Sequence, residues 1–257
     1  MKKAYYLQTY LVSDVGMLRK KNEDNFIFHG RYNEKSEDHM ECENHICITE
    51  PVLYGVFDGM GGEAFGEVAS SLMAGTCQKY LLHAGHLKED ATALCQTGNE
   101  LVVREEKQRG LSMGSTASML IFDEKVVVCN VGDSPIYLYR DGVLQSIYEE
   151  QTERKLYEEL GLQEILKKKK KYCLTQHIGM HGEGLQILPH LEELEVQDQD
   201  VFLICSDGLT DMVDEAVIKE TLSTIDAESA RKLVSHALEN GGRDNVTVIL
   251  IQVKGCN

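Results

Sequence analysis

The sequence contains no long uninterrupted apolar segment, and this argues against a membrane-spanning helix, which needs about 20 apolar residues in succession. The N-terminal stretch "MKKAYYLQTYLVSD" also lacks the continuous apolar core of a signal peptide, because its polar and apolar residues alternate. Alternation of this kind instead predicts a first strand. From these absences we expect a soluble, cytoplasmic protein that does not act at a membrane.

Paired cysteine motifs are also missing. The eight cysteines form no C-x2-C pair and no regular framework, which argues against a disulfide scaffold. Cys129 and Cys205 lie in apolar runs, where reduced core thiols are the simplest interpretation. The polar segment 31–50 holds His39, Cys42, His45 and Cys47, but their spacing matches no standard zinc site, so we expect a polar insertion without a metal.

Positive charge is scarce. Lys and Arg number 26 against 42 Asp and Glu, so the formal net charge is 26 − 42 = −16. This balance argues against nucleic acid or an anionic membrane as the main partner. The run "KKKKK" (Lys167 to Lys171) is the local exception, and two interpretations stay open: a solvated surface, or a basic flap near an anionic substrate.

No internal repeat and no linker rich in Pro, Gly or Ser divides the chain, so we predict a single domain over 1–257. Hydrophobic periodicity predicts strands at 4–12, 26–30 and 52–57, a helical region that ends near Gly110, and an antiparallel meander over 115–148. Residues 149–193 are the least regular and form a variable segment. The remaining predicted elements are a buried strand in "VFLICSDG", helices at 214–223 and 226–239, and a final strand at 245–253.

The stretch "VFDGMGGEAFGEVAS" (56–70) admits two interpretations. Its "GMGGEA" satisfies the glycine pattern of a dinucleotide-binding loop. Against that, Asp58 would face the pyrophosphate, and no acidic strand end follows about 20 residues later. A dinucleotide fold also needs parallel βαβ units, which the predicted meander lacks. We therefore favour a carboxylate placed at a strand end to hold a metal.

Acidic residues recur at predicted strand ends. Asp58, Asp133 and Asp207 follow apolar strands, and Asp244 immediately precedes one. A single Asp-Gly is ordinary turn chemistry, but four such acids together with the polar "RKKNEDN" are harder to explain as turns. Oxygen-rich, thiol-poor donors suit Mg²⁺ or Mn²⁺. Two such ions about 3.5–4 Å apart would activate a water and neutralise a phosphoryl group.

Six segments resemble, in order, the motifs of the metal-dependent serine/threonine protein phosphatases of type 2C, and "DGMGG" is similar to the bacterial branch. The segments are "SDVGMLRKKNEDN" (13–25), "FDGMGGEAFGEVAS" (57–70), "GSTASMLIF" (114–122), "NVGDSPIYLYRDG" (130–142), "CSDGLTDMV" (205–213) and "GGRDNVTVIL" (241–250). The resemblance implies an α+β fold, a four-layer αββα sandwich of two stacked antiparallel sheets flanked by helices. The metals would lie in a cleft at one sheet edge.

The resemblance also implies residue roles. Asp58 would bridge two catalytic Mn²⁺ or Mg²⁺ ions, and the carbonyl of Gly59 would bind the second ion. Asp207 and Asp244 would complete the protein ligands of the first ion, and Glu23 would belong to the shell of the second.

Other matching positions are implied to assist. Arg19 would grip the substrate phosphate, for which a guanidinium fork is suited. Asp24 would orient metal-bound water, and Asp133 with Asp207 would hold a third, weaker metal. Thr116 and Asn245 are expected to support the site, although packing explains either equally well.

The implied reaction is hydrolysis of phosphoserine and phosphothreonine on proteins by a metal-bridging hydroxide that attacks phosphorus in line, without a phosphoenzyme. The implied partners are phosphorylated proteins, with a eukaryotic-type Ser/Thr kinase and its targets as the natural candidates, and we expect a monomer. A thiol phosphatase is not expected, because no cysteine starts a C-x5-R segment. The alternative is a catalytically weak pseudophosphatase that binds phosphoproteins, against which the intact acid set argues.

The sequence departs from the family pattern at several positions. Met60 stands where animal relatives carry a histidine proposed to protonate the leaving group, and Pro135 replaces an arginine. The segment after Gln145 is short and lysine-rich, and "LTQHIGM" (174–180) matches its motif only loosely. Gly61 and Gly62 are expected to form the turn before the following helix. These departures leave substrate choice open.

Overall fold

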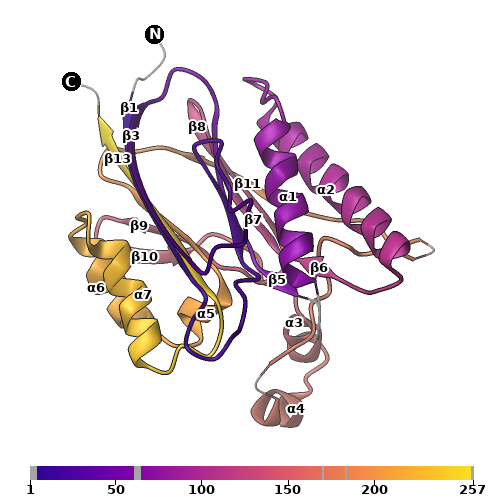
Figure 1. Ribbon diagram of the computed structural model, residues 1–257. Coiled ribbons are helices and arrows are strands. Elements are labelled where there is room, and N and C mark those ends of the chain that lie inside the picture. Colours follow the sequence, from indigo (N-terminus) through magenta and orange to yellow (C-terminus); the bar gives the residue numbers. More distant parts are fainter. Residues whose placement is uncertain (1–4, 61–64, 170, 183, 256–257) are drawn as a thin grey trace.

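The computed structural model describes residues 5–60, 65–169, 171–182 and 184–255 (Figure 1). Within them the strands form two large sheets and one short pair, and every pairing is antiparallel. No helix among these residues is long and apolar enough to cross a membrane. The predicted turn at Gly61 and Gly62 lies outside the described residues.

The six-stranded sheet unites the first and last strands of the chain. Its order is β10 (Val143–Ser146), β9 (Ile136–Arg140), β12 (Val201–Cys205), β13 (Val246–Gly255), β1 (Tyr5–Asp14) and β3 (His39–Cys47). β1 and β13 pair along their whole lengths, from Tyr5 opposite Gly255 to Asp14 opposite Val246. The residues that follow β1 and the residues that precede β13 therefore lie at the same end of the sheet.

The five-stranded sheet stacks on the first. Its order is β11 (His190–Glu195), β8 (Lys125–Val131), β7 (Ala117–Phe122), β4 (Val52–Phe57) and β2 (Asn25–Phe28). The short pair β5 (Gly59–Met60) and β6 (Gly114–Ser115) continues from β4 and leads into β7. This pair places the chain just after Asp58 beside the lower end of the sandwich in Figure 1.

Helices cover both outer faces, as Figure 1 shows. α1 (Gly66–Lys79) and α2 (Leu87–Arg109) pack on the five-stranded sheet, and α5 (Asp207–Thr210), α6 (Glu215–Ser223) and α7 (Ser229–Glu239) pack on the six-stranded sheet. α3 (Glu153–Glu159) and α4 (Gln163–Lys168) project away from the sandwich and bury none of their described side chains.

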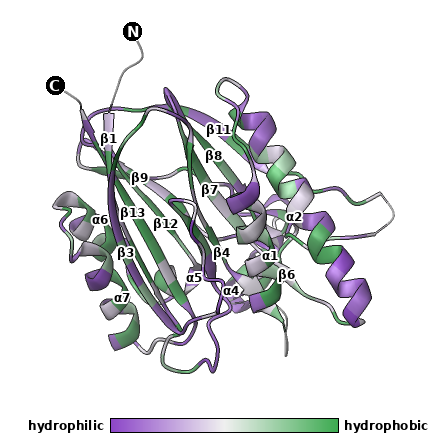
Figure 2. Ribbon diagram, turned by 45° about the horizontal axis from the view of Figure 1, so that its top comes forward, coloured by the Kyte–Doolittle hydropathy of each residue, from purple (hydrophilic) through white to green (hydrophobic). Residues whose placement is uncertain are grey.

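Three apolar layers hold the sandwich together. The layer between the sheets contains large side chains of both sheets, including Phe26, Tyr54 and Phe202. The second layer joins the five-stranded sheet to α1 and α2, and the third joins the six-stranded sheet to α5, α6 and α7. Figure 2 shows the central strands as the most hydrophobic part of the fold. The predicted α+β sandwich with four layers is thus confirmed.

Local sequence patterns account for several turns and helix ends. Two hairpins form within the predicted meander 115–148, with turns at Asp123-Glu124 and Asp141-Gly142. However, the hairpin β7–β8 belongs to the five-stranded sheet and the hairpin β9–β10 to the six-stranded sheet, so the segment is not one continuous meander. Asp141 and Gly142 both have positive φ, of 51° and 78°, as a two-residue type I′ turn requires. α2 ends as expected, with Gly110 in the left-handed region.

Three predictions needed correction. Segment 31–50 is not only a polar insertion, because it contains edge strand β3, and β11 (His190–Glu195) lies where no strand was predicted. The last helix begins at Ser229, and Asp226 instead accepts a hydrogen bond from the Glu228 amide in the preceding turn. On β3 the exposed and sheltered positions alternate, which separates His39 and His45 from Cys42 and leaves no shared metal site for them.

Candidate metal-binding and phosphate-binding site

The acids at strand ends meet at one edge of the sandwich. Asp58 directly follows β4, Asp133 follows β8, Asp207 follows β12 at the start of α5, and Asp244 precedes β13. Burial raises the pKa of the Asp58 carboxyl well above its usual range, and the charges of Asp24, Asp207, Asp133 and Asp244 raise it further. The structure therefore brings together all the strand-end acids that the sequence singled out.

Thr116 fixes the backbone of Asp58. The Asp58 amide donates to Oγ1 of Thr116 at 3.0 Å, and the Thr116 amide donates to the carbonyl of Asp58 at 2.9 Å. Oγ1 of Thr116 also lies 2.6 Å from Oγ of Ser134, next to Asp133. This pair of reciprocal hydrogen bonds supports the positioning role expected of Thr116. The sequence did not identify Ser134 as a residue of the site.

Gly59 lies where no other residue fits. A Cβ atom there would be 2.3 Å from the carbonyl oxygen of Gly66 and 2.4 Å from that of Glu23. The backbone after Asp58 thus touches both the start of α1 and the loop that carries Glu23. Ser70, one turn into α1, adds a hydrogen bond of 2.6 Å from its Oγ to the Glu23 carbonyl. Only glycine lets these three backbone segments approach so closely.

Asn245 holds the loop between β1 and β2. Its Nδ2 donates to the carbonyls of Val15 and Lys21 at 2.8 and 2.9 Å, and its Oδ1 accepts from the Glu23 amide at 2.9 Å. Asn245 is buried, so these bonds are shielded from water. The side chain expected to support the site therefore fixes both ends of the loop that contains Arg19.

Asp24 lies behind the cluster. Its Oδ2 accepts from Oγ of Ser206 at 2.7 Å, and the Thr247 amide donates to the same Ser206 oxygen at 3.0 Å. Burial raises the pKa of Asp24 to about 7, against the lowering effect of the hydroxyl donors, and Asp207 and Asp244 raise it further. A hydrogen-bonded acid with this pKa is suited to hold or accept a proton near neutral pH.

Arg19 lies at the rim of the cluster. Its Nη2 donates to Oδ2 of Asp244 at 2.7 Å, and its Nη1 is 3.8 Å from Oε2 of Glu23. The side chain is 46% exposed, so part of its five-donor fork faces solvent. Burial raises the pKa of the Glu23 carboxyl, while the Arg19 charge lowers it. The arginine can therefore contact an anion that approaches the acids.

A second cation reaches the cluster from the lysine-rich run. Nζ of Lys171 lies 3.2 Å from Oδ2 of Asp207 and 3.2 Å from Oδ2 of Asp211. Burial raises the pKa of Asp207, and Lys171 lowers it. Burial and the charge of Asp207 raise the pKa of Asp133 to about 7. Neither Lys171 nor Asp211 was identified as a site residue from the sequence.

The rest of the run does not form one basic surface. Nζ of Lys169 donates to Glu153 at 2.6 Å within the projecting segment, and Lys167 lies 3.5 Å from Glu164. Lys170 is outside the described residues. Among the described lysines of the run, Lys167 and Lys169 form ion pairs within the projecting segment, whereas Lys171 contacts Asp207 and Asp211.

The donors fit a hard divalent cation, although no three His, Cys, Asp or Glu side chains in the described part of the chain form a ready-made metal cage. All candidate ligands present oxygen, the preference of Mg²⁺ and Mn²⁺. Oε2 of Glu67, in the first turn of α1, is buried without a hydrogen-bond partner among these residues, and its charge acts on Glu23. Burial and the charges of neighbouring acids raise the pKa of Asp58, Asp133 and Asp207, and a bound cation would relieve this repulsion.

Similarity to known proteins agrees with this arrangement. A model of the family described as protein phosphatase 2C matches residues 29–240. The chain is 31% identical over 252 residues to the serine/threonine protein phosphatase PstP of Mycobacterium tuberculosis and covers 44% of that relative. It is 29% identical over 254 residues to the serine/threonine phosphatase stp of Listeria innocua, with 93% of both chains covered.

Solved structures show the same fold. The crystal structure of the Mycobacterium tuberculosis phosphatase PstP/Ppp matches with a TM-score of 0.80 and 29% identity, covering 97% of this chain and 99% of that one. The catalytic domain of PstP in complex with two manganese ions matches with a TM-score of 0.77, 29% identity and the same coverage. The chain spans less than half the length of the full mycobacterial relative. Sequence, fold and converging acids agree that the chain belongs to the protein phosphatase 2C family.

Proposed function

We propose that the chain is a metal-dependent protein phosphatase that hydrolyses phosphoserine and phosphothreonine on proteins. The observation that carries the proposal is the convergence of Asp58, Asp207 and Asp244 beside the exposed fork of Arg19. The relatives named above are serine/threonine phosphatases, which supports the same activity here.

Asp58, Asp207 and Asp244 would hold the first metal ion, and Asp58, the Gly59 carbonyl and Glu23 the second. Asp133 with Asp207 would hold a third, weaker one. When bound, Mn²⁺ or Mg²⁺ would lower the pKa of a water and neutralise the charge of the phosphoryl group. The complex of the PstP catalytic domain with two manganese ions supports two such sites.

The protein's own groups would place the substrate and manage protons. Arg19 would bind the phosphate oxygens with the donors that do not contact Asp244, as a charge-assisted fork. Asp24 is buried and hydrogen-bonded to Ser206, so it can orient a neighbouring water without moving. Thr116 and Asn245 would maintain the geometry by fixing Asp58 and the Arg19 loop. Water would attack directly, so no side chain becomes phosphorylated.

The decisive experiment measures phosphate release from a phosphothreonine peptide with Mn²⁺, with Mg²⁺ and with a chelator. We expect turnover only with metal, and Asp207→Asn should lose about 3 kcal/mol or more of transition-state stabilisation, that is at least ~100-fold in kcat. Metal-independent turnover, or full activity in the variant, would refute the mechanism. Peptide binding without turnover under every metal tested would instead favour the binding-module alternative.

A further inference from the structure

The loop beside the phosphate-binding arginine presents two large apolar side chains to solvent. Met17 and Leu18 immediately precede Arg19, and they are 66% and 69% exposed. Single exposed apolar residues are common on protein surfaces and need no explanation. Here two of them are adjacent in the chain and border the rim of the candidate site.

The loop that carries them is held firmly, so their exposure is not the result of a loose backbone. The Met17 amide donates to the carbonyl of Gly242 at 2.8 Å, and Asn245 holds the loop at Val15 and Lys21. Gly16 has a φ of +80°, and a Cβ there would lie 2.2 Å from the carbonyl of Asp244. The turn is therefore specified for glycine and packed against the chain segment that contains a candidate ligand.

The base of the Met17 side chain is also fixed. A Cβ on Gly242 would lie 2.7 Å from Cγ of Met17, so the stem of the methionine occupies the space that this glycine leaves. The stem is anchored while most of the side chain remains exposed. A fixed, exposed methionine is suited to contact varied apolar partners, because its thioether is polarizable and adaptable.

We propose that Met17 and Leu18 contact a large apolar residue of the substrate close to its phosphorylated serine or threonine. The inference rests on the proposed function, because it places the phosphate at Arg19. An extended peptide advances about 3.3–3.6 Å per residue, so residues within roughly three positions of a phosphate held by Arg19 stay near enough to reach the two side chains that precede Arg19. The loop thus selects phosphoproteins by an apolar neighbour of the phosphorylated residue.

The test compares phosphothreonine peptides that are identical except for a leucine or a serine placed at each position from −3 to +3. Wild-type protein should prefer leucine at one or more positions by about tenfold in kcat/KM, the effect expected for partial burial of one such side chain. In the double variant Met17→Ser and Leu18→Ser this preference should disappear. The control Leu81→Ser, at a residue that is 75% exposed and lies just beyond α1, should keep it.

p-Nitrophenyl phosphate has no flanking residues, so its turnover should be equal in all three proteins. Equal kcat/KM for leucine and serine peptides in the wild type would overturn the proposal. So would a double variant that loses p-nitrophenyl phosphate turnover as strongly as leucine-peptide turnover, because the loop would then act on catalysis. If the wild type hydrolyses none of these compounds, the proposed function fails instead. Fluorescence anisotropy of the labelled peptides would then test the apolar preference separately.

Discussion

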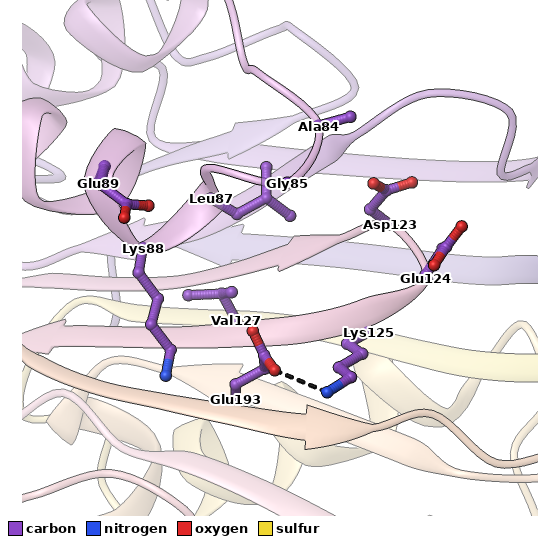
Figure 3. Close-up of a pocket in the computed structure, with 10 residues that line it drawn as sticks. All are labelled: Ala84, Gly85, Leu87, Lys88, Glu89, Asp123, Glu124, Lys125, Val127 and Glu193. Atoms are coloured by element: carbon purple, nitrogen blue, oxygen red, sulfur yellow. Dashed lines mark hydrogen bonds and ion pairs between the residues drawn. The ribbon is translucent and has the colours of Figure 1, made fainter.

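Two charged regions at different ends of the sandwich shift the pKa of their carboxyl groups in opposite directions. One is a cavity of about 530 Å³ between the start of α2 and the β7–β8 turn (Figure 3). There Glu193 lies between Lys88 and Lys125, and Lys125 donates to it at 2.8 Å. The Lys125 hydrogen bond lowers the pKa of Glu193, and the charge of Lys88 lowers it further. At the acid cluster, burial and neighbouring acids raise the pKa of Asp58.

The difference shows why cavity size alone does not identify this site. In the cavity of Figure 3, alternating charges satisfy one another on an exposed surface, which leaves little tendency to bind a further ion. At the sheet edge, carboxylates face one another, and the nearby cations Arg19 and Lys171 come from separate loops. A cluster of carboxylates that outnumbers its neighbouring cations is the feature that indicates function.

The largest effect is expected for Gly59→Ala. This variant tests whether the geometry of the acid cluster depends on close contact between backbone segments. The new Cβ would be 2.3 Å from the Gly66 carbonyl oxygen. Overpacking of this kind should cost about 3 kcal/mol of unfolding free energy, measured by urea denaturation, and should abolish phosphatase activity.

Gly75→Ala is the matched control, because a Cβ there would meet its nearest atom, Oη of Tyr32, at an ordinary 3.5 Å. It lies inside α1, where alanine is favoured, so stability should stay the same or rise. Equal stability of the two variants would contradict the packing argument at Gly59.

Arg19→Ala tests the cation at the rim. We expect KM for a phosphopeptide to rise by about tenfold or more, since a hydrogen bond to a charged group contributes roughly 1.5–3 kcal/mol. Because phosphate binding should act largely in the ground state, kcat should fall less than KM rises. Steady-state kinetics measure kcat and KM separately, and Lys20→Ala serves as the control at the neighbouring residue. A larger fall in kcat would mean that Arg19 acts mainly in the transition state.

The pH dependence of stability tests the charge imbalance directly. Asp24 and Asp133 have a pKa raised to about 7, whereas an unfolded aspartate has a pKa of about 3.9. The folded state therefore binds more protons, so this contribution to stability is fully present below about pH 4 and is lost as pH rises toward 7. In chelator, Tm should be higher at pH 5.5 than at pH 7.5, and Mn²⁺ should reduce the difference. A Tm in chelator that rises over this range would show that the acids do not dominate.

The smallest effect is expected at the opposite end. Lys125→Ala removes the ion pairs to Glu193 and Glu195, all of them exposed side chains. Exposed pairs contribute little because water and salt screen them. We expect an unchanged denaturation midpoint and unchanged phosphatase kinetics. A loss of activity would indicate that the cavity of Figure 3 takes part in the function.

The acids at strand ends were predictable because an apolar run and the acidic residue next to it are both visible in the local sequence. Asp58 and Asp207 follow apolar runs that are typical of buried strands. β4 and β8 both run antiparallel to β7, so their last residues lie at the same end of the five-stranded sheet, and the end of β12 lies beside the start of β13 in the six-stranded sheet. Strand β3 was not predictable in the same way. Its outward positions carry His39, Glu41 and Glu43, and its inward positions offer few large apolar residues, so the pattern resembles a loop.

Contacts between distant segments could not be predicted from local patterns. Lys171 reaches Asp207 across 36 positions, and its placement depends on how the projecting segment folds back on the body. Ser206 was adjacent to a predicted ligand, but its bond to Asp24 spans 182 positions. Glu67 lies in the first turn of α1, where acids are common, and only its buried Oε2 atom, which has no hydrogen-bond partner among the described residues, distinguishes it.

The pairing of β1 with β13 has a consequence for folding. The Arg19–Asp244 ion pair joins residues 225 positions apart, and its two partners flank these strands. Contacts of such long range carry a large loop-closure entropy and form late in folding. A chain that has folded only its five-stranded sheet therefore has Asp58 and Asp133 at the strand ends, but not Asp244 from the segment before β13. Under the proposed function, the acid cluster would become able to bind metal ions and substrate only after the first and last strands of the sheet have joined.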